Sequence, residues 1–194
     1  MGKILESIQN TVITGIIAMI VIIGFQSNWF VEFGFDQAFY ARYLHVMSGV
    51  MWIGLLWYFN FVQIPTMPSI PAELKPAIGK HIAPAALFWF RWGAMATLIT
   101  GLWLASANHY IVEALTLQSG FVLIGLGMWM AVIMWFNVWF VIWPAQKVAL
   151  GLIEADADAK AAAARKAMLF SRTNTLLSIP MLLCMVGQQN GMAF

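Results

Sequence analysis

The sequence predicts an all-α integral membrane protein, a helical bundle of about five transmembrane helices. Of its 194 residues, 62% are hydrophobic and only 9% are charged, whereas a soluble domain carries roughly 25% charged residues. The apolar residues occur in continuous runs and do not alternate with polar ones, which indicates helices. The composition excludes a soluble enzyme, a secreted disulfide scaffold and a disordered regulator. We expect the lipid bilayer as a partner and no nucleic acid, because the net charge is only +2 and the basic residues are scattered.

Five stretches of the chain are long enough to cross a bilayer, which takes about 20 mostly apolar residues. Together they make up one transmembrane domain over residues 1–194. The predicted spans cover about residues 11–29, 43–63, 85–108, 118–143 and 173–190. Lys3 ahead of the first span is typical of a signal peptide. No small-x-small cleavage site follows that span, so we interpret it as a retained anchor.

Two connecting segments have a composition of their own. Ile64–Ala83 contains four prolines, which predicts a structured but non-helical cytoplasmic connection. Residues 145–170 are rich in alanine, with acidic residues at the start and basic residues at the end, as a helix dipole favours. We expect a short cytoplasmic helix at about 147–168 that continues the fourth span after Pro144.

The basic residues are distributed unevenly between the two sides of the predicted membrane. One side holds Lys3, Lys75, Lys80, Arg91, Lys147, Lys160, Arg165, Lys166 and Arg172. The other side holds Arg42 alone. Because basic residues accumulate on the cytoplasmic side, we expect a cytoplasmic N-terminus and a C-terminus outside the cytoplasm.

His45 is a candidate cofactor ligand, since it lies about one turn inside the outer end of the second predicted span. Gly49 follows at i+4 and Trp52 at i+7, so a small residue and a flat ring share its helix face. A histidine beside a glycine on a transmembrane helix is a common way of holding haem, because the glycine lets the macrocycle approach the backbone. The alternative is a histidine that is hydrogen-bonded to a neighbouring helix or to interfacial water.

His109 ends the third predicted span, so it can lie at a depth similar to that of His45. The two histidines are the candidate iron ligands of a haem b, although a histidine at a helix end is also an ordinary interfacial residue. Arg91 has aromatic neighbours on both sides and is either part of this site or an anchor to the cytoplasmic headgroups. The predicted cofactor site consists of His45, His109, Gly49, Trp52 and Arg91.

Motifs for other chemistries are absent from the sequence. There is no CxxCH haem attachment, no HExxH zinc motif and no Gly-rich phosphate loop. Whether the chain is an enzyme stays open.

Polar residues inside apolar runs predict packing between spans. We expect Asn137 and residues 172–174 to contact other spans and not lipid, because an unpaired amide there costs about 1 kcal/mol or more.

Four stretches, in this order, resemble one protein family. They are Arg42–Gly54 (RYLHVMSGVMWIG), Ala86–Trp92 (ALFWFRW), Asn137–Gln146 (NVWFVIWPAQ) and Ser171–Asn174 (SRTN) leading to Ile179–Leu182 (IPML). Together they resemble the membrane domain of the bacterial urate hydroxylases, which are cytochrome c-type urate oxidases with an N-terminal multi-span membrane region. The helix with His45 is also distantly similar to the small four-span protoporphyrinogen oxidases, where such a histidine is thought to meet haem.

The resemblance implies a multi-pass protein of the bacterial inner membrane with a periplasmic C-terminus, and it leaves three functions open. The first is a haem b-binding or electron-transfer subunit that works with a c-type cytochrome or other membrane subunits. The second is a non-catalytic structural or accessory subunit of a larger membrane complex. The third is a urate-oxidising enzyme that uses a separate cytochrome chain.

The sequence also departs from the family pattern, and these departures favour the second function over the third. The family has a histidine where Phe88 stands, an acidic residue near Gly93, and histidines near Thr173 and Gln189. No CxxCH follows the last span, so we expect the cytochrome c domain to be lacking.

Overall fold

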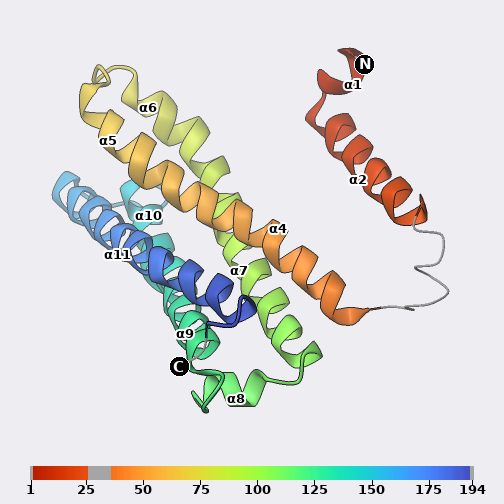
Figure 1. Cartoon of the computed structure of the whole chain (residues 1–194). Coiled ribbons are helices and arrows are strands. Elements are labelled where there is room, and N and C mark those ends of the chain that lie inside the picture. Colours follow the sequence, from red (N-terminus) through yellow and green to blue (C-terminus); the bar gives the residue numbers. More distant parts are fainter. Residues whose placement is uncertain (1, 26–35, 193–194) are drawn as a thin grey trace. The chain divides into compact units, whose positions relative to one another are not determined.

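The computed structural model describes residues 2–25 and 36–192, and every regular element in these residues is a helix (Figure 1). The all-α class predicted from the sequence is therefore confirmed. The chain divides into two compact units, Met1–Gln37 and Ala38–Phe194.

The first unit contains two helices, α1 (Gly2–Leu5) and α2 (Ile8–Phe25). Ser7 caps α2, since its hydroxyl accepts a hydrogen bond from the Asn10 backbone N–H at 3.5 Å. α2 corresponds to the first predicted span, about 11–29, and begins earlier than expected; residues 26–29 lie outside the described residues. Its apolar stretch, Ile8–Gly24, is shorter than the spans of the second unit.

The second unit is built on four helical segments, each long and apolar enough to cross a membrane. They are Gln37–Ser69, Lys75–Ala107, Val122–Ala149 and Ala157–Gln189. They overlap the predicted spans at about 43–63, 85–108, 118–143 and 173–190 but have different ends. A short helix, α8 (Ile111–Leu115), lies between the second and third segments.

Three of these segments are composite helices. The first joins α4 (Gln37–Trp57), η1 (Tyr58–Gln63), α5 (Ile64–Thr66) and η2 (Met67–Ser69). The second joins α6 (Lys75–Ala77), η3 (Ile78–Ile82) and α7 (Ala83–Ala107). The third joins α9 (Val122–Phe136), η4 (Asn137–Ile142) and α10 (Trp143–Ala149). The fourth is the single helix α11 (Ala157–Gln189), which lies alongside α9 and α10 (Figure 1).

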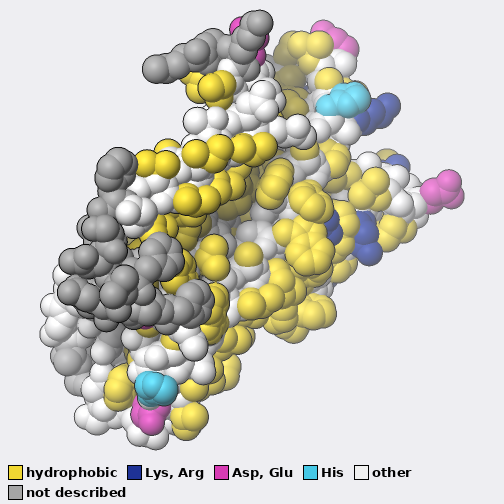
Figure 2. Space-filling model, turned by 90° about the vertical axis from the view of Figure 1, so that its right-hand side faces the viewer, with side chains coloured by type: hydrophobic (Ala, Val, Ile, Leu, Met, Phe, Trp, Pro, Cys, Tyr) yellow, Lys and Arg dark blue, Asp and Glu magenta, His cyan; other side chains and the backbone are white. Residues whose placement is uncertain are grey.

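The outer surface of the four segments is largely apolar. Only 28–39% of the most apolar window of each segment is buried inside the structure. Figure 2 shows hydrophobic side chains across the middle of the visible face, with most of the charged side chains near its margins. A soluble monomer does not expose an apolar surface of this extent, so the apolar helices indicate a membrane protein.

A π-helical turn precedes a proline in each composite segment. The residue just before the proline donates its backbone N–H to the carbonyl five residues back: Ile64 to Phe59, Ala83 to Ile78, and Trp143 to Val138. The prolines that follow are Pro65, Pro84 and Pro144. A proline ring clashes with the carbonyl of residue i−4 in an α-helix and has no N–H to donate. The wider π-turn relieves this clash and keeps the helix continuous.

The expectation of a non-helical connection over Ile64–Ala83 is wrong for most of that segment. Pro65, Pro68 and Pro76 lie in the first positions of α5, η2 and α6. Pro76 lies in the first turn after the interruption, where an intrahelical N–H is not required, whereas Pro65 is accommodated by the π-turn before it. Only residues 70–74 interrupt the helices there.

The expected cytoplasmic helix at about 147–168, continuing the fourth span, is also wrong. α10 ends before Gly151, whose φ of 75° is the left-handed conformation that terminates helices. α11 begins after Asp156, whose carboxylate accepts a hydrogen bond from the Ala159 N–H at 2.7 Å. α11 then continues through Pro180, so the alanine-rich run and the fifth predicted span form one helix. At about 50 Å it exceeds the ~30 Å hydrocarbon thickness.

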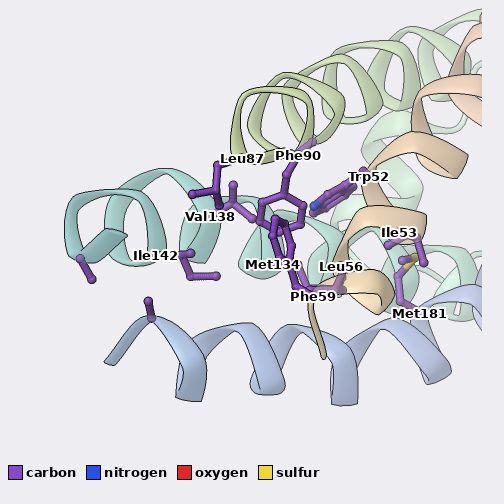
Figure 3. Packing of buried hydrophobic residues seen from close by; sticks show 13 residues of the cluster. Trp52, Ile53, Leu56, Phe59, Leu87, Phe90, Met134, Val138, Ile142 and Met181 are labelled. Carbon is purple, nitrogen blue, oxygen red and sulfur yellow. The ribbon is translucent and has the colours of Figure 1, made fainter. Parts of the chain in front are cut away.

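The core of the second unit lies where the four segments meet (Figure 3). Trp52 and Phe90 are each 1% exposed, and Leu56 and Met134 are fully buried. Phe59 packs edge-on against Phe90 with 5.7 Å between ring centroids. Lipid tails are as apolar as these side chains, so close packing and interhelical hydrogen bonds stabilise the contacts more than the hydrophobic effect does.

A pair of buried amides connects the third and fourth segments. The Asn137 side-chain NH₂ donates to the Asn174 side-chain oxygen at 2.9 Å, and the Asn174 NH₂ donates to the Met134 carbonyl at 2.9 Å. The expectation that Asn137 and Asn174 pack against other spans is confirmed. For Arg172 and Thr173 it is wrong, because both are exposed on the opposite side of α11.

Candidate functional site

His45 lies on α4, and its half-buried ring is held by the neighbouring helix α7. Its Nδ1 atom is 2.9 Å from the backbone carbonyl oxygen of Thr97. A carbonyl only accepts hydrogen bonds, so in the neutral imidazole Nδ1 carries the proton and Nε2 keeps its lone pair. The Thr100 hydroxyl is 3.5 Å from Nδ1 and donates to the Ala96 carbonyl at 2.6 Å. These contacts orient the ring and leave Nε2 available as a ligand atom.

Gly101 makes room for this ring. A Cβ atom placed on Gly101 would lie 2.8 Å from His45 Cε1 and 3.0 Å from Nδ1, so a side chain there would displace the imidazole. A Cβ on Gly93, two turns earlier on α7, would lie 3.3 Å from the backbone nitrogen of Trp52. Gly93, Thr97 and Gly101 follow each other at four-residue spacing. Such a stripe of small residues lets transmembrane helices approach closely, and here it brings α7 against α4.

Gly49 and Trp52 lie where α4 packs against α7. A Cβ on Gly49 would meet the methyl group of Thr97 at 3.9 Å, so α7 covers the glycine at this point. Trp52 is 1% exposed and belongs to the core cluster. It lies about 10 Å along the helix axis from His45.

His109 lies in an exposed turn after the end of α7, with a φ of 57°. Its backbone N–H donates to the Ser106 carbonyl at 3.0 Å. The last residue of α7, Ala107, lies about 9 Å along the helix axis beyond Gly101, which contacts His45. The structure therefore does not place the two histidines on facing helices at one level.

Arg91 lies near the start of α7 and stacks on aromatic rings of the third segment. Its guanidinium carbon is 3.3 Å from the centre of the Trp143 ring and 5.9 Å from that of Trp139. Its Nε donates to the Leu87 carbonyl at 3.2 Å. The Lys147 ammonium is 5.9 Å from the same Trp143 ring. This cluster has the character of an interfacial anchor, and it is remote from the His45 level.

Thr97 and Gly101 are the site residues that the sequence analysis does not find. They contact His45 from a different helix, and nothing in the local sequence around His45 indicates them. Their own four-residue spacing with Gly93 is the signal that points to a helix–helix contact on this face of α7.

The comparison with known families bears on the second half of the chain. A family model described as "Urate oxidase N-terminal" matches residues 109–194. Residues 109–194 are therefore similar to a urate oxidase N-terminal region. The predicted resemblance is confirmed over this part, which contains Asn137–Gln146 and Ser171–Asn174. No curated protein and no solved structure matches the chain.

The urate oxidase N-terminal match covers α8, α9, η4, α10 and α11, and with them the Asn137–Asn174 amide pair. The stretches Arg42–Gly54 and Ala86–Trp92 lie outside it. His45 and Arg91 therefore belong to the part of the chain before the matched region, and Arg91 contacts that region through its stacking on Trp143.

Proposed function

We propose that the chain is a multi-pass subunit of the bacterial inner membrane that binds haem b through His45 and passes electrons to a partner cytochrome. The match to a urate oxidase N-terminal region supports a redox role, because an oxidase must hand on the electrons that it removes. The hydrogen bond between His45 Nδ1 and the Thr97 carbonyl carries the proposal.

This hydrogen bond is the arrangement that metal-binding histidines use. Such a histidine almost always donates its second ring N–H to a carbonyl, a carboxylate or water, which fixes the tautomer and makes the ligating nitrogen more basic. His45 also lies within a helix long enough to span a membrane, where an ionisable residue is a functional candidate by default. Its Nε2 forms no hydrogen bond within the described residues, so it is free to coordinate iron.

Two residues of this chain would support iron ligation by His45. Thr97 holds the imidazole in the required tautomer, and Gly101 leaves space for the ring. The exposed position of His109 does not fit a second ligand opposite His45. We infer that any further iron ligand would come from a partner subunit, which agrees with a subunit role. When bound, a haem of this kind supplies one-electron exchange.

The proposed orientation has the N-terminus in the cytoplasm and the C-terminus in the periplasm. The distribution of basic residues supports it, with nine on one side and Arg42 alone on the other. A reporter that is active only in the cytoplasm, fused after Phe194, should stay silent. Activity of that fusion would reverse the orientation.

A second candidate is an accessory subunit of a larger membrane complex without a cofactor. The spread of the five predicted site residues over several levels of the bundle favours it, because no cofactor site is assembled from them as a group. Urate oxidation with a separate cytochrome is a third function, and it has only the name of the matched family in its favour.

The haem content of variants distinguishes these functions. The protein is purified from its own membranes in mild detergent, together with any bound partners, and haem is measured per chain. We expect His45→Ala to lose the haem and His81→Ala, an exposed histidine on η3, to retain it. Equal haem content in both variants would exclude His45 as a ligand.

A further inference from the structure

Two cations share one tryptophan ring where α7 passes the junction of η4 and α10. The Arg91 guanidinium carbon lies 3.3 Å from the centre of the Trp143 ring, and the Lys147 ammonium lies 5.9 Å from the same centre. The two cationic groups are therefore at most about 9 Å apart, a distance that one phosphate group can bridge by accepting a charge-assisted hydrogen bond from each of them. All three side chains are half-buried, so a molecule from outside can reach them.

The helices that carry this cluster provide no negative charge for it. α7, η4 and α10 contain no Asp or Glu, and neither cation forms an ion pair within the described residues. The Nε of Arg91 donates to the Leu87 carbonyl at 3.2 Å, whereas its other N–H groups form no hydrogen bond to any described residue. Two like charges at this separation repel each other, and more strongly beside apolar side chains than in water. The cluster therefore favours an anion that contacts both cations.

The cluster lies at the depth where lipid phosphates are found. Trp143 is about 30 Å along the helix axis from Val122, the first residue of α9, and this distance matches the ~30 Å thickness of the hydrocarbon core. Trp92, next to Arg91, is 49% exposed, as is typical of tryptophans in the belt at a membrane interface. Trp92 packs edge-on against Trp139 with 5.4 Å between ring centroids, about one turn nearer to the middle of the span. These two rings provide an apolar surface on the side of the cations where acyl chains lie.

We propose that Arg91, Lys147 and Trp143 form a binding site for the headgroup phosphate of an anionic phospholipid. Stacking on Trp143 uses the face of the guanidinium and leaves its N–H edge free to bind phosphate oxygens. The Lys147 ammonium binds the same phosphate, and the acyl chains lie along the neighbouring tryptophan rings. A zwitterionic lipid fits less well, because its own cationic group already balances its phosphate. Basic sites between transmembrane helices bind anionic headgroups in this way. The proposal is independent of haem at His45 and requires only that the helices lie in a membrane.

The test measures the melting temperature of the whole chain, purified in a neutral detergent, with increasing concentrations of three probes. Dioctanoyl phosphatidylglycerol and dioctanoyl phosphatidylcholine have the same acyl chains and differ in net charge, and glycerol 3-phosphate has the phosphate without the chains. We expect saturable stabilisation by phosphatidylglycerol and at least tenfold weaker binding of the other two probes. Equal stabilisation by both lipids would indicate apolar solvation alone, and equal stabilisation by glycerol 3-phosphate would indicate a site for water-soluble anions. Either result overturns the proposal.

Variants connect the effect to the two cations. Arg91→Gln and Lys147→Gln should each weaken binding of phosphatidylglycerol at least tenfold, measured against the melting temperature of the same variant without lipid. Lys147 is farther from the ring than Arg91 is, so Lys147→Gln should fold even if Arg91→Gln does not. Arg165→Gln is the matched control, because Arg165 is an exposed arginine of α11 that does not stack on Trp143, and it should bind like the wild type. The proposal is overturned if no probe stabilises the protein, if Lys147→Gln binds like the wild type, or if Arg165→Gln loses as much binding as Lys147→Gln.

Discussion

Asn174→Leu tests how strongly the buried amide pair holds the third and fourth segments together. Asn174 is 0% exposed, and it accepts a hydrogen bond from Asn137 and donates one to the Met134 carbonyl. Leucine is similar in volume but forms neither bond. The substitution therefore leaves the Asn137 side-chain NH₂ buried without its partner, and it leaves the Met134 carbonyl with the Asn137 backbone N–H alone.

The expected loss of stability follows from the two broken hydrogen bonds. Interhelical hydrogen bonds in membrane proteins contribute about 0.6 kcal/mol on average and up to about 1.7 kcal/mol. An orphaned buried group in a soluble protein costs about 1–3 kcal/mol. For two bonds we expect about 1–2 kcal/mol. For a protein of this size, 1 kcal/mol lowers the melting temperature by about 2–4 °C, so Asn174→Leu should melt roughly 2–8 °C below the wild type.

Thermal unfolding in detergent, followed by circular dichroism, measures this shift. Thr173→Leu is the matched control, because Thr173 is exposed on the same helix and its hydroxyl bonds only within that helix, to the Leu169 carbonyl. The double variant Asn137→Leu, Asn174→Leu removes both amides and should lose less stability than the sum of the single variants. An unchanged melting temperature for Asn174→Leu, or fully additive effects, would refute the role of the pair.

Two further substitutions test contacts of α7. Gly101→Ala should lower haem content and stability, because its Cβ would lie 2.8 Å from His45 Cε1. Gly49→Ala should be tolerated, because its Cβ would lie at an ordinary 3.9 Å from the Thr97 methyl group. Equal effects of the two variants on haem content and melting temperature would contradict this. Arg91→Gln should lose the stacking on Trp143, which contributes about 0.5–1 kcal/mol to stability. The melting temperature should therefore fall by a few degrees, and the tryptophan fluorescence should change. An unaltered fluorescence spectrum would show that the two side chains do not interact in the membrane.

The membrane class and the approximate spans follow from composition and run length, because these set how much of the chain water can cover. The helix ends do not follow. Pro65 suggests the end of a helix, but a π-turn before it keeps the helix continuous, as at Pro84 and Pro144. Gly151 and Asp156 are the local signals that separate α10 from α11. Both residues can be identified in the sequence. They separate the two helices at this point, although the alanine-rich run suggests one continuous helix.

The candidate site could be predicted only in part. His45 stands out because a histidine within an apolar run is rare. Its partner Thr97 cannot be identified from the sequence, because a backbone carbonyl has no residue signature and the contact depends on how α4 crosses α7. Gly49 shares a helix face with His45, and in the structure this glycine faces the Thr97 side chain of α7. His109 has an apparent depth similar to that of His45, but it lies in an exposed turn. Sequence spacing sets which face a residue is on and leaves open which helix packs against that face.

The visible absorption spectrum of the protein isolated with its partners from its own membranes tests the central claim most directly. If His45 holds a haem b, the preparation shows a Soret band that shifts on reduction, and His45→Ala prepared in the same way lacks it. A featureless spectrum of the wild type, or an unchanged Soret band in His45→Ala, would contradict the account and leave the accessory subunit as the function of this chain.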